Sequence, residues 1–151
     1  NTIANAGGDG ITVGWTDSTG IDPMIRGNTI PQGGIAVNVP SQADPAIEGN
    51  TIEDTTNGIF LNRSPATVTG NTIRRIKGVA LLSSTLGAPV ITGNTIEDST
   101  TGIAIDASVT ATITGNTFCG NGVDLRDSGD VTTLPPGNTV CAAGGSPSAA
   151  P

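Results

Sequence analysis

The stretch Gly27-Asn28-Thr29-Ile30, written GNTI, returns along the whole chain at a nearly constant interval. Its seven copies and close variants carry the asparagines Asn1, Asn28, Asn50, Asn71, Asn94, Asn116 and Asn138. These asparagines are separated by 27, 22, 21, 23, 22 and 22 residues. A fixed period of this length indicates a solenoid, in which each repeat forms one turn of the chain.

The remainder of each repeat predicts short β-strands. One apolar run is the NTI itself, a second follows a glycine, as in Gly58-Ile59-Phe60-Leu61, and a third precedes the next GN, as in Val90-Ile91-Thr92. These runs are rich in β-branched residues, alternate with a period of two, and are bounded by Gly, Asn, Asp or Pro. No stretch carries a helical period of useful length. Each repeat is therefore expected to contain three strands.

The pattern G-N-x-I followed by G-[IV]-x-[VIL] resembles the repeats of the right-handed, pectate-lyase-like superfamily of parallel β-helices. The resemblance covers the chain from Asn1 to about Ala142. It implies an all-β, right-handed parallel β-helix (a solenoid) over residues 1–142, with about six to seven coils and three short parallel sheets. Residues 143–151 are expected to form a Gly/Ser/Pro/Ala tail. Function does not follow, because enzymes, tailspikes, adhesins and structural proteins share such coils.

In such a coil GNTI has a structural explanation. Glycine takes the positive φ of a corner without a Cβ clash, and Asn tolerates the same turn region. Strand alternation then directs Thr outward and Ile inward. Because coils stack at about 4.8 Å, we expect the repeated asparagines to form a ladder of hydrogen-bonded amides along the axis.

Charged residues also fall into columns when the repeats are aligned. The two residues after GNTI are Glu53-Asp54, Arg74-Arg75 and Glu97-Asp98 in three successive coils. This order predicts an inter-coil charge ladder in which arginines lie between carboxylates. Asp106 and Arg126 are expected to pair in the same way. The alternative is that the basic residues bind an anionic polysaccharide.

The two cysteines, Cys119 and Cys141, occupy equivalent positions 22 residues apart. Coil stacking would bring their Cα atoms to about 4.8 Å, which a disulfide accepts. A disulfide indicates an oxidising environment, so we expect an extracellular or cell-surface location. The alternative is a pair of free thiols stacked by the repeat.

Candidate residues for chemistry are few. The chain has no His, which excludes Ser-His-Asp triads and His-ligated zinc. Resemblance to polysaccharide lyases and hydrolases directs attention to acidic clusters, and an acidic group that could hold Ca²⁺ weakly consists of Asp106, Asp124, Asp127 and Asp130. Trp15 is the single Trp that could stack on a sugar ring. We therefore predict no catalytic residue and no cofactor.

Partners are restricted by charge. A net charge of −7 and a pI near 4.1 argue against nucleic acid, and no apolar run approaches the length of a membrane span. The chain starts inside a repeat, without the cap helix that family members usually carry. We expect either stacking of one subunit on the next or the loss of earlier coils from a longer β-helix.

The sequence thus predicts a non-catalytic extracellular structural protein that self-assembles head to tail into a filament or surface layer. Its expected partner is a second copy of itself, with a polysaccharide as a further candidate. Alternative functions are a fragment of a polysaccharide lyase or hydrolase, and a carbohydrate-binding or ice-binding module. The column of threonines after each Asn suggests the ice-binding alternative.

Overall fold

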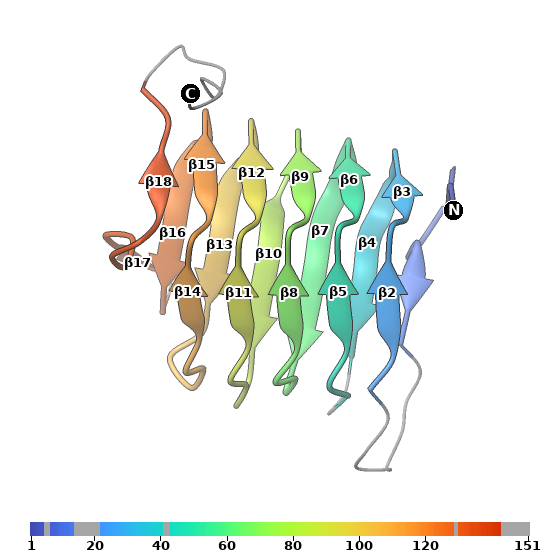
Figure 1. Cartoon of the computed structure of the whole chain (residues 1–151), viewed down its shortest axis with the longest axis horizontal. Helices are drawn as coiled ribbons and strands as arrows, with labels where there is room; N and C mark the ends of the chain where they lie inside the picture. The colour runs from blue at the N-terminus through green and yellow to red at the C-terminus, as the bar shows by residue number, and fades with distance from the viewer. Residues whose placement is uncertain (5–6, 14–21, 41–42, 129, 143–151) are drawn as a thin grey trace.

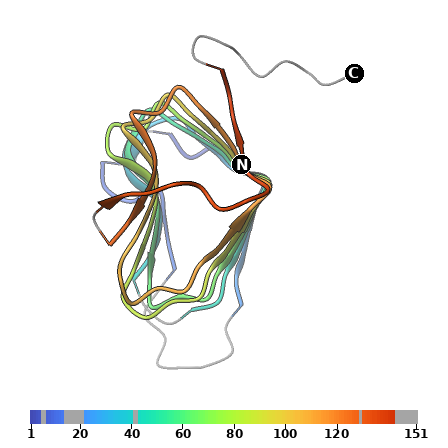
Figure 2. The same cartoon turned by 90° about the vertical axis from the view of Figure 1, so that its left-hand side faces the viewer.

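A computed structural model describes residues 1–4, 7–13, 22–40, 43–128 and 130–142. Throughout these ranges the chain forms strands, turns and loops and no helix. The strands lie side by side along the long axis of the molecule (Figure 1), and the successive coils superpose when viewed along that axis (Figure 2). The predicted all-β parallel β-helix is confirmed.

The longest sheet has seven strands, all parallel to their neighbours except the last, which runs antiparallel to β16. In spatial order the strands are β1 (Ile11–Thr12), β4 (Gly33–Val39), β7 (Thr55–Asn62), β10 (Val79–Ser84), β13 (Thr101–Ile105), β16 (Val123–Asp127) and β17 (Asp130–Val131). The antiparallel strand β17 covers the edge of β16 that the next parallel strand would occupy.

The other two sheets are built from strands of two or three residues. The five-stranded sheet contains β2 (Met24–Arg26), β5 (Ala46–Glu48), β8 (Thr67–Thr69), β11 (Val90–Thr92) and β14 (Thr112–Thr114). The six-stranded sheet contains β3 (Thr29–Ile30), β6 (Thr51–Glu53), β9 (Thr72–Arg74), β12 (Thr95–Glu97), β15 (Thr117–Cys119) and β18 (Thr139–Val140). The GNTI repeats therefore supply the six-stranded sheet and the corner before it.

The strand register aligns equivalent residues of successive repeats in columns along the solenoid axis. Thr2 forms an isolated bridge with Thr29, and the same position continues through every strand of the six-stranded sheet to Thr139. The five-stranded sheet gives about five complete turns, slightly fewer than the six to seven coils expected. The difference arises at the C-terminal end, where the described residues after Asn116 add no strand to the five-stranded sheet and those after Asn138 form β18 alone.

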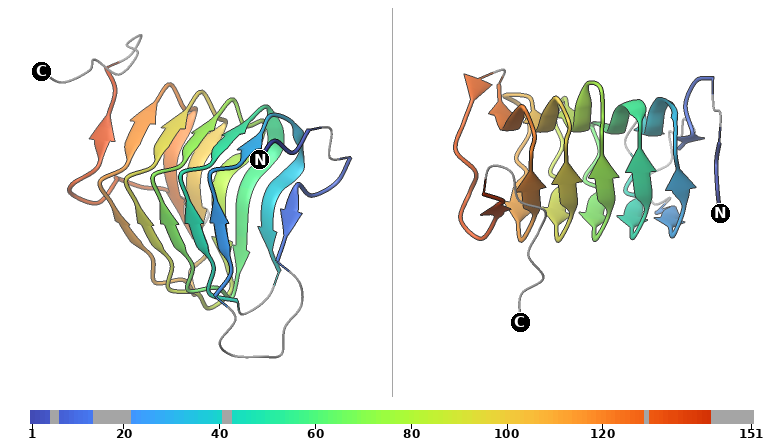
Figure 3. Two further views of the ribbon diagram at one scale, coloured as in Figure 1. Left: turned by 45° about the vertical axis from the view of Figure 1, so that its right-hand side comes forward. Right: turned by 90° about the horizontal axis from the view of Figure 1, so that it is seen from above.

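The core lies inside the coil and consists of aliphatic columns. One column is fully buried and contains Ile30, Ile52, Ile73, Ile96 and Phe118. Each such side chain contributes about 1.5–3 kcal/mol by leaving water. Val140 continues this column but is 57% exposed, because no described strand follows β18. The N-terminus and β18 lie at opposite ends of the solenoid (Figure 3).

Candidate functional site

The corner between the five-stranded and six-stranded sheets is made by a glycine and a buried asparagine. Gly49 has φ of +58° and Gly70 has φ of +63°, the left-handed region that a Cβ disfavours. The asparagines that follow them, Asn50 and Asn71, are each only 1% exposed. A buried amide must be hydrogen-bonded, and the stacked coils supply its partners.

Asn71 shows how the asparagines are joined. The backbone nitrogen and Nδ2 of Asn50 both donate to Asn71 Oδ1 at 2.9 Å. Asn71 in turn donates from its backbone nitrogen and Nδ2 to Asn94 Oδ1, at 3.0 and 2.9 Å. Its Nδ2 also donates to the backbone oxygen of Ile47 at 2.9 Å. The amide therefore has partners in its own corner and in both neighbouring coils.

The ladder has a direction along the axis. From Asn28 to Asn116, each backbone nitrogen and Nδ2 donate to Oδ1 of the next asparagine toward the C-terminal end. Asn1 joins it through one longer bond of 3.3 Å, from its Nδ2 to Asn28 Oδ1. Donors therefore face one end of the solenoid and acceptors face the other.

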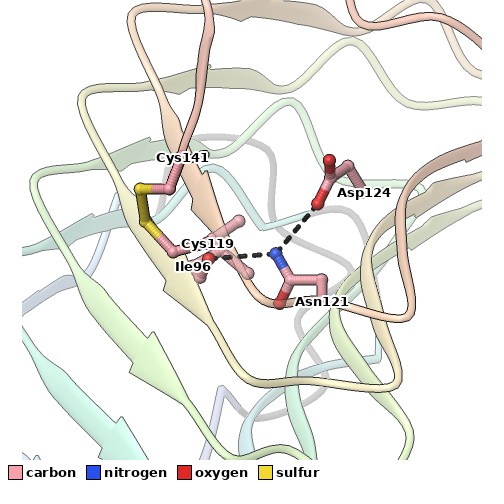
Figure 4. Close-up of a disulfide and its surroundings, with 5 residues drawn as sticks. All are labelled: Ile96, Cys119, Asn121, Asp124 and Cys141. Atoms are coloured by element: carbon pink, nitrogen blue, oxygen red, sulfur yellow. Dashed lines mark hydrogen bonds between the residues drawn. A yellow bond between two sulfur atoms is a disulfide. The ribbon is translucent and has the colours of Figure 1, made fainter. Parts of the chain in front are cut away.

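A second, shorter ladder occurs at the corner after the six-stranded sheet. The backbone nitrogen of Ile76 donates to Ser99 Oγ at 3.2 Å, and that of Ser99 donates to Asn121 Oδ1 at 3.0 Å. Figure 4 shows that Asn121 also donates from Nδ2 to Ile96 and to Asp124. Sequence reasoning missed this ladder because its members differ in type, although their spacings of 23 and 22 residues match the period.

The charge ladder forms between two coils. Arg74 Nε donates to Glu53 Oε2 at 2.8 Å, and Arg75 Nη2 donates to Asp54 Oδ2 at 2.8 Å. Arg75 also pairs with Glu53. The hydrogen bond from Arg74 is the main cause that lowers the pKa of Glu53, and the bond from Arg75 does the same for the pKa of Asp54.

Two expectations about charges are corrected. Glu97 lies opposite Arg74 in the register, but among the described residues neither Glu97 nor Asp98 forms an ion pair, since both guanidinium groups are bonded to Glu53 and Asp54. The register also places Arg126 opposite Ala104 rather than Asp106. The expected Asp106–Arg126 stacking is therefore wrong by two positions.

Cys119 and Cys141 are joined in a disulfide, with their Cα atoms 4.9 Å apart (Figure 4). Cys119 ends β15, and Cys141 follows β18 in the next coil. The backbone nitrogen of Cys141 donates to the oxygen of Phe118 at 2.8 Å, so the pair sits in the parallel register of the sheet. The disulfide fastens the last described coil to the one before it.

The described side chains among the acidic candidates for Ca²⁺ are not gathered into a site. Asp124 Oδ1 accepts from Asn121 at 3.1 Å, and Asp127 Oδ1 accepts from Ser128 at 2.9 Å. No group of three His, Cys, Asp or Glu side chains that could hold a metal ion occurs in the part of the chain that the structure describes. The backbone of Asp130 belongs to β17, but its side chain lies outside the described residues, as does Trp15.

A groove of about 570 Å³ lies at the C-terminal end of the solenoid, beside the segment that links β17 to β18. Apolar side chains line much of it, among them Val123, Leu125, Leu134 and Val140. Among the described residues of this lining, Asp124 is the one titratable side chain. A single carboxylate does not supply the acid and base pair that glycoside hydrolysis requires.

Residues 1–138 match the family described as periplasmic copper-binding protein (NosD). The chain belongs to the NosD family. No curated protein and no solved structure matches it significantly. Within the described residues of this NosD-family chain, no helix has the length and apolar character needed to cross a membrane. The periplasmic description of the family and the disulfide agree on an oxidising compartment.

The family description prompts a test of the copper donors in this chain. Cu(I) prefers soft thiolate and thioether ligands, and imidazole also suits copper. The chain has no His and one Met, and both cysteines are held in the disulfide. Met24 lies in β2, near the end of the solenoid opposite the disulfide (Figure 1). The disulfide-bonded chain therefore does not offer a donor set that fits copper.

Proposed function

We propose that this chain is a non-catalytic structural β-solenoid of an oxidising, extracytoplasmic compartment, and that it assembles head to tail into a filament or surface layer. The observation that carries the proposal is the direction of the asparagine ladder. Every member from Asn28 to Asn116 donates toward the same end. A stack of such coils is a template for one more coil in the same orientation.

The two end coils of the described solenoid are complementary in hydrogen bonding. Within the described residues, Asn1 Oδ1 accepts no hydrogen bond, and the backbone nitrogen of Asn138 has no acceptor. Asn1 of a second copy, placed against Asn138, would continue the ladder with an acceptor facing a donor. Two Asn138 ends placed together would oppose donors, so head-to-tail stacking is favoured over a symmetric contact.

The same end coils expose apolar side chains that belong to the core columns. Val140 is 57% exposed although Phe118, its neighbour in the column, is fully buried. Ile11 at the other end is only partly buried, whereas Val37 opposite it in β4 is fully buried. A second copy would cover these side chains and pair the edge of β18 that has no neighbouring strand within the described residues.

The structure gives less support to the alternative functions. The described residues that line the groove beside β16 and β18 include a single carboxylate, which weakens the lyase or hydrolase alternative. Ice binding would need a second column of threonines on the neighbouring five-stranded sheet. That column is interrupted, because Arg26 and Glu48 occupy the position taken by Thr69, Thr92 and Thr114. A flat double face of threonines for ice binding is therefore not formed.

Assembly is tested by sedimentation over a range of protein concentrations, together with electron microscopy. We expect species that grow with concentration and rods one solenoid wide. The variant Val140→Lys places a charge on the end coil and should abolish growth. Its matched control is Leu86→Lys, because Leu86 is also exposed, at 71%, but lies in the loop between β10 and β11. Monomers at all concentrations, or equal loss in both variants, would contradict the proposal.

Copper handling is a second candidate function, since the family to which the chain belongs is described as copper-binding. Because both cysteines are held in the disulfide, this candidate requires their reduction to two thiols, which are soft ligands. Copper uptake in the oxidised and the reduced chain, measured by elemental analysis after dialysis, tests this candidate. Failure to retain copper in either state would rule it out.

A further inference from the structure

We propose that one copy of the chain joins the next through the six-stranded sheet and not through the seven-stranded sheet, with Thr2 of the second copy opposite Thr139 of the first. The inference rests on the head-to-tail assembly proposed above, and it names the strands and the groove that form the junction. It follows from the C-terminal end of the described solenoid, where β17 covers the edge of β16 and no described strand covers β18.

Strand β17 closes the end of the seven-stranded sheet. It runs antiparallel to β16, with Val131 opposite Arg126. The backbone nitrogen of Thr132 extends this contact, because it donates to the oxygen of Leu125 at 3.2 Å. A further parallel strand would need the same edge of β16. The first strand of a second copy therefore finds this edge occupied.

The segment that follows β17 covers part of the core. It crosses the end of the solenoid toward β18 (Figure 2), and its Leu134 packs against the core. Pro135 and Pro136 belong to the same segment and have no backbone N–H to offer a neighbouring strand. The groove described above remains beside this segment, with residues of β16 and β18 in its lining.

The groove lies where a column of the core ends. Within the described residues, Val140 is the last member of the column that begins with Ile3. Val140 lines the groove together with Val123 and Leu125, whereas Ile3 is only partly buried in the first described coil. Ile3 of a second copy would lie on Val140 and enter the groove, so that both side chains would leave water.

The backbone register of the junction follows from the rest of the six-stranded sheet. Thr139 donates from its backbone nitrogen to the oxygen of Asn116 at 2.8 Å, and every earlier strand of this sheet makes the equivalent bond. By the same rule, the backbone nitrogen of Thr2 in the second copy donates to the oxygen of Asn138. The two threonine side chains then lie about 4.8 Å apart, as neighbours on adjacent strands do. Both threonines are exposed, so charges can be placed on them as probes.

The experiment measures the protein concentration at which sedimenting species appear. Thr2→Glu/Thr139→Glu opposes like charges across the junction, whereas Thr2→Glu/Thr139→Lys pairs opposite charges. We expect the first variant to need about fivefold more protein than the second. Thr51→Glu/Thr139→Glu controls for net charge, because Thr51 lies in the same column but inside the solenoid. It should need less protein than Thr2→Glu/Thr139→Glu.

Thr12→Lys tests the seven-stranded sheet. Thr12 begins the column that ends at Arg126, so a junction through this sheet would bring two cations together. Because β17 covers that edge, we expect no change in assembly. Equal concentrations for the two Thr2 variants, or a loss in Thr12→Lys, would overturn this junction while assembly of the wild-type chain left the proposed function standing. Monomers of the wild-type chain at all concentrations would overturn head-to-tail assembly, and the junction with it.

Discussion

Asn50 donates two hydrogen bonds to one atom of Asn71, from its backbone nitrogen and from Nδ2, both at 2.9 Å to Oδ1. The pair joins adjacent coils at a corner where both residues are buried. The amide of Asn71 thus accepts from one coil and donates to the next. This arrangement explains why the same four residues return once per turn.

Replacement of Asn71 by Ala should therefore be severe. It removes the acceptor of two buried donors on Asn50 and one of the donors to Asn94 Oδ1. We expect a loss of about 2–4 kcal/mol in the free energy of unfolding, measured by urea denaturation. Asn1→Ala is the control, because Asn1 is exposed and its side chain makes a single bond of 3.3 Å. Similar losses in both variants would show that the ladder does not carry the stability.

Gly49→Ala tests the left-handed corner. Gly49 has φ of +58°, and no atom lies within 4 Å of the position that a Cβ would take. The expected loss of about 1–2 kcal/mol in unfolding free energy therefore arises from backbone conformation alone. Gly7→Ala is the matched control, since a Cβ there is also free of contacts and the residue is not in the left-handed region. Thermal unfolding of the two variants measures this difference in stability. An unchanged midpoint in Gly49→Ala would contradict this explanation.

The ion pairs between Glu53, Asp54 and their arginines predict a pH dependence. The pKa values of both carboxyl groups are lowered in the folded chain, from ordinary values of 4.5 and 3.8. The ion pairs therefore make their full contribution to the free energy of unfolding above those ordinary pKa values. This contribution is lost as the pH falls through the lowered pKa values. For the partly exposed Glu53–Arg74 pair we expect a contribution of about 0.2–1 kcal/mol to the free energy of unfolding.

Urea denaturation between pH 7 and pH 3 measures this effect in the wild-type chain and in Arg74→Gln. The variant should lose less stability on acidification, because Glu53 loses the stronger of its two charged partners and keeps only Arg75. Arg126→Gln is the control, since Arg126 is exposed and forms no ion pair within the described residues. Parallel pH profiles for the wild-type chain and Arg74→Gln would contradict the assignment.

Most of the fold could be predicted because a 22-residue period converts sequence position into spatial position. The stacking of Glu53 on Arg74 and of Cys119 on Cys141 follows from counting residues, and both are found. Asp106 and Arg126 are only 20 residues apart, two fewer than the period, so their expected pairing did not follow from the count. The residue 22 positions before Arg126 is Ala104, and it lies opposite Arg126 in the register.

The choice of partner could not be predicted from columns alone. Arg74 lies between Glu53 and Glu97 in the register, yet its guanidinium bonds to Glu53. A register fixes the backbone but leaves long side chains free to choose between two neighbours. The second ladder was missed for a related reason, because Ser99 and Asn121 use different polar groups in equivalent positions.

Two buried serines give a last prediction in which the same substitution should have opposite effects. Ser83 and Ser64 are both fully buried. Ser64 Oγ donates to the oxygen of Ala43 at 2.7 Å and accepts from the nitrogen of Ala66 at 3.3 Å, whereas Ser83 Oγ has no hydrogen-bond partner among the residues that the structure describes. A buried hydroxyl without a partner has given up its bonds to water and gained none in exchange.

Ser83→Ala should therefore leave the free energy of unfolding unchanged or raise it by up to about 1 kcal/mol. Ser64→Ala should lower it by about 1–3 kcal/mol, because the oxygen of Ala43 is left without its donor. Urea denaturation of the two variants under one set of conditions makes the comparison, since both remove the same atom. A larger loss in Ser83→Ala than in Ser64→Ala would mean that the Ser83 hydroxyl has a partner in the folded protein, such as a buried water.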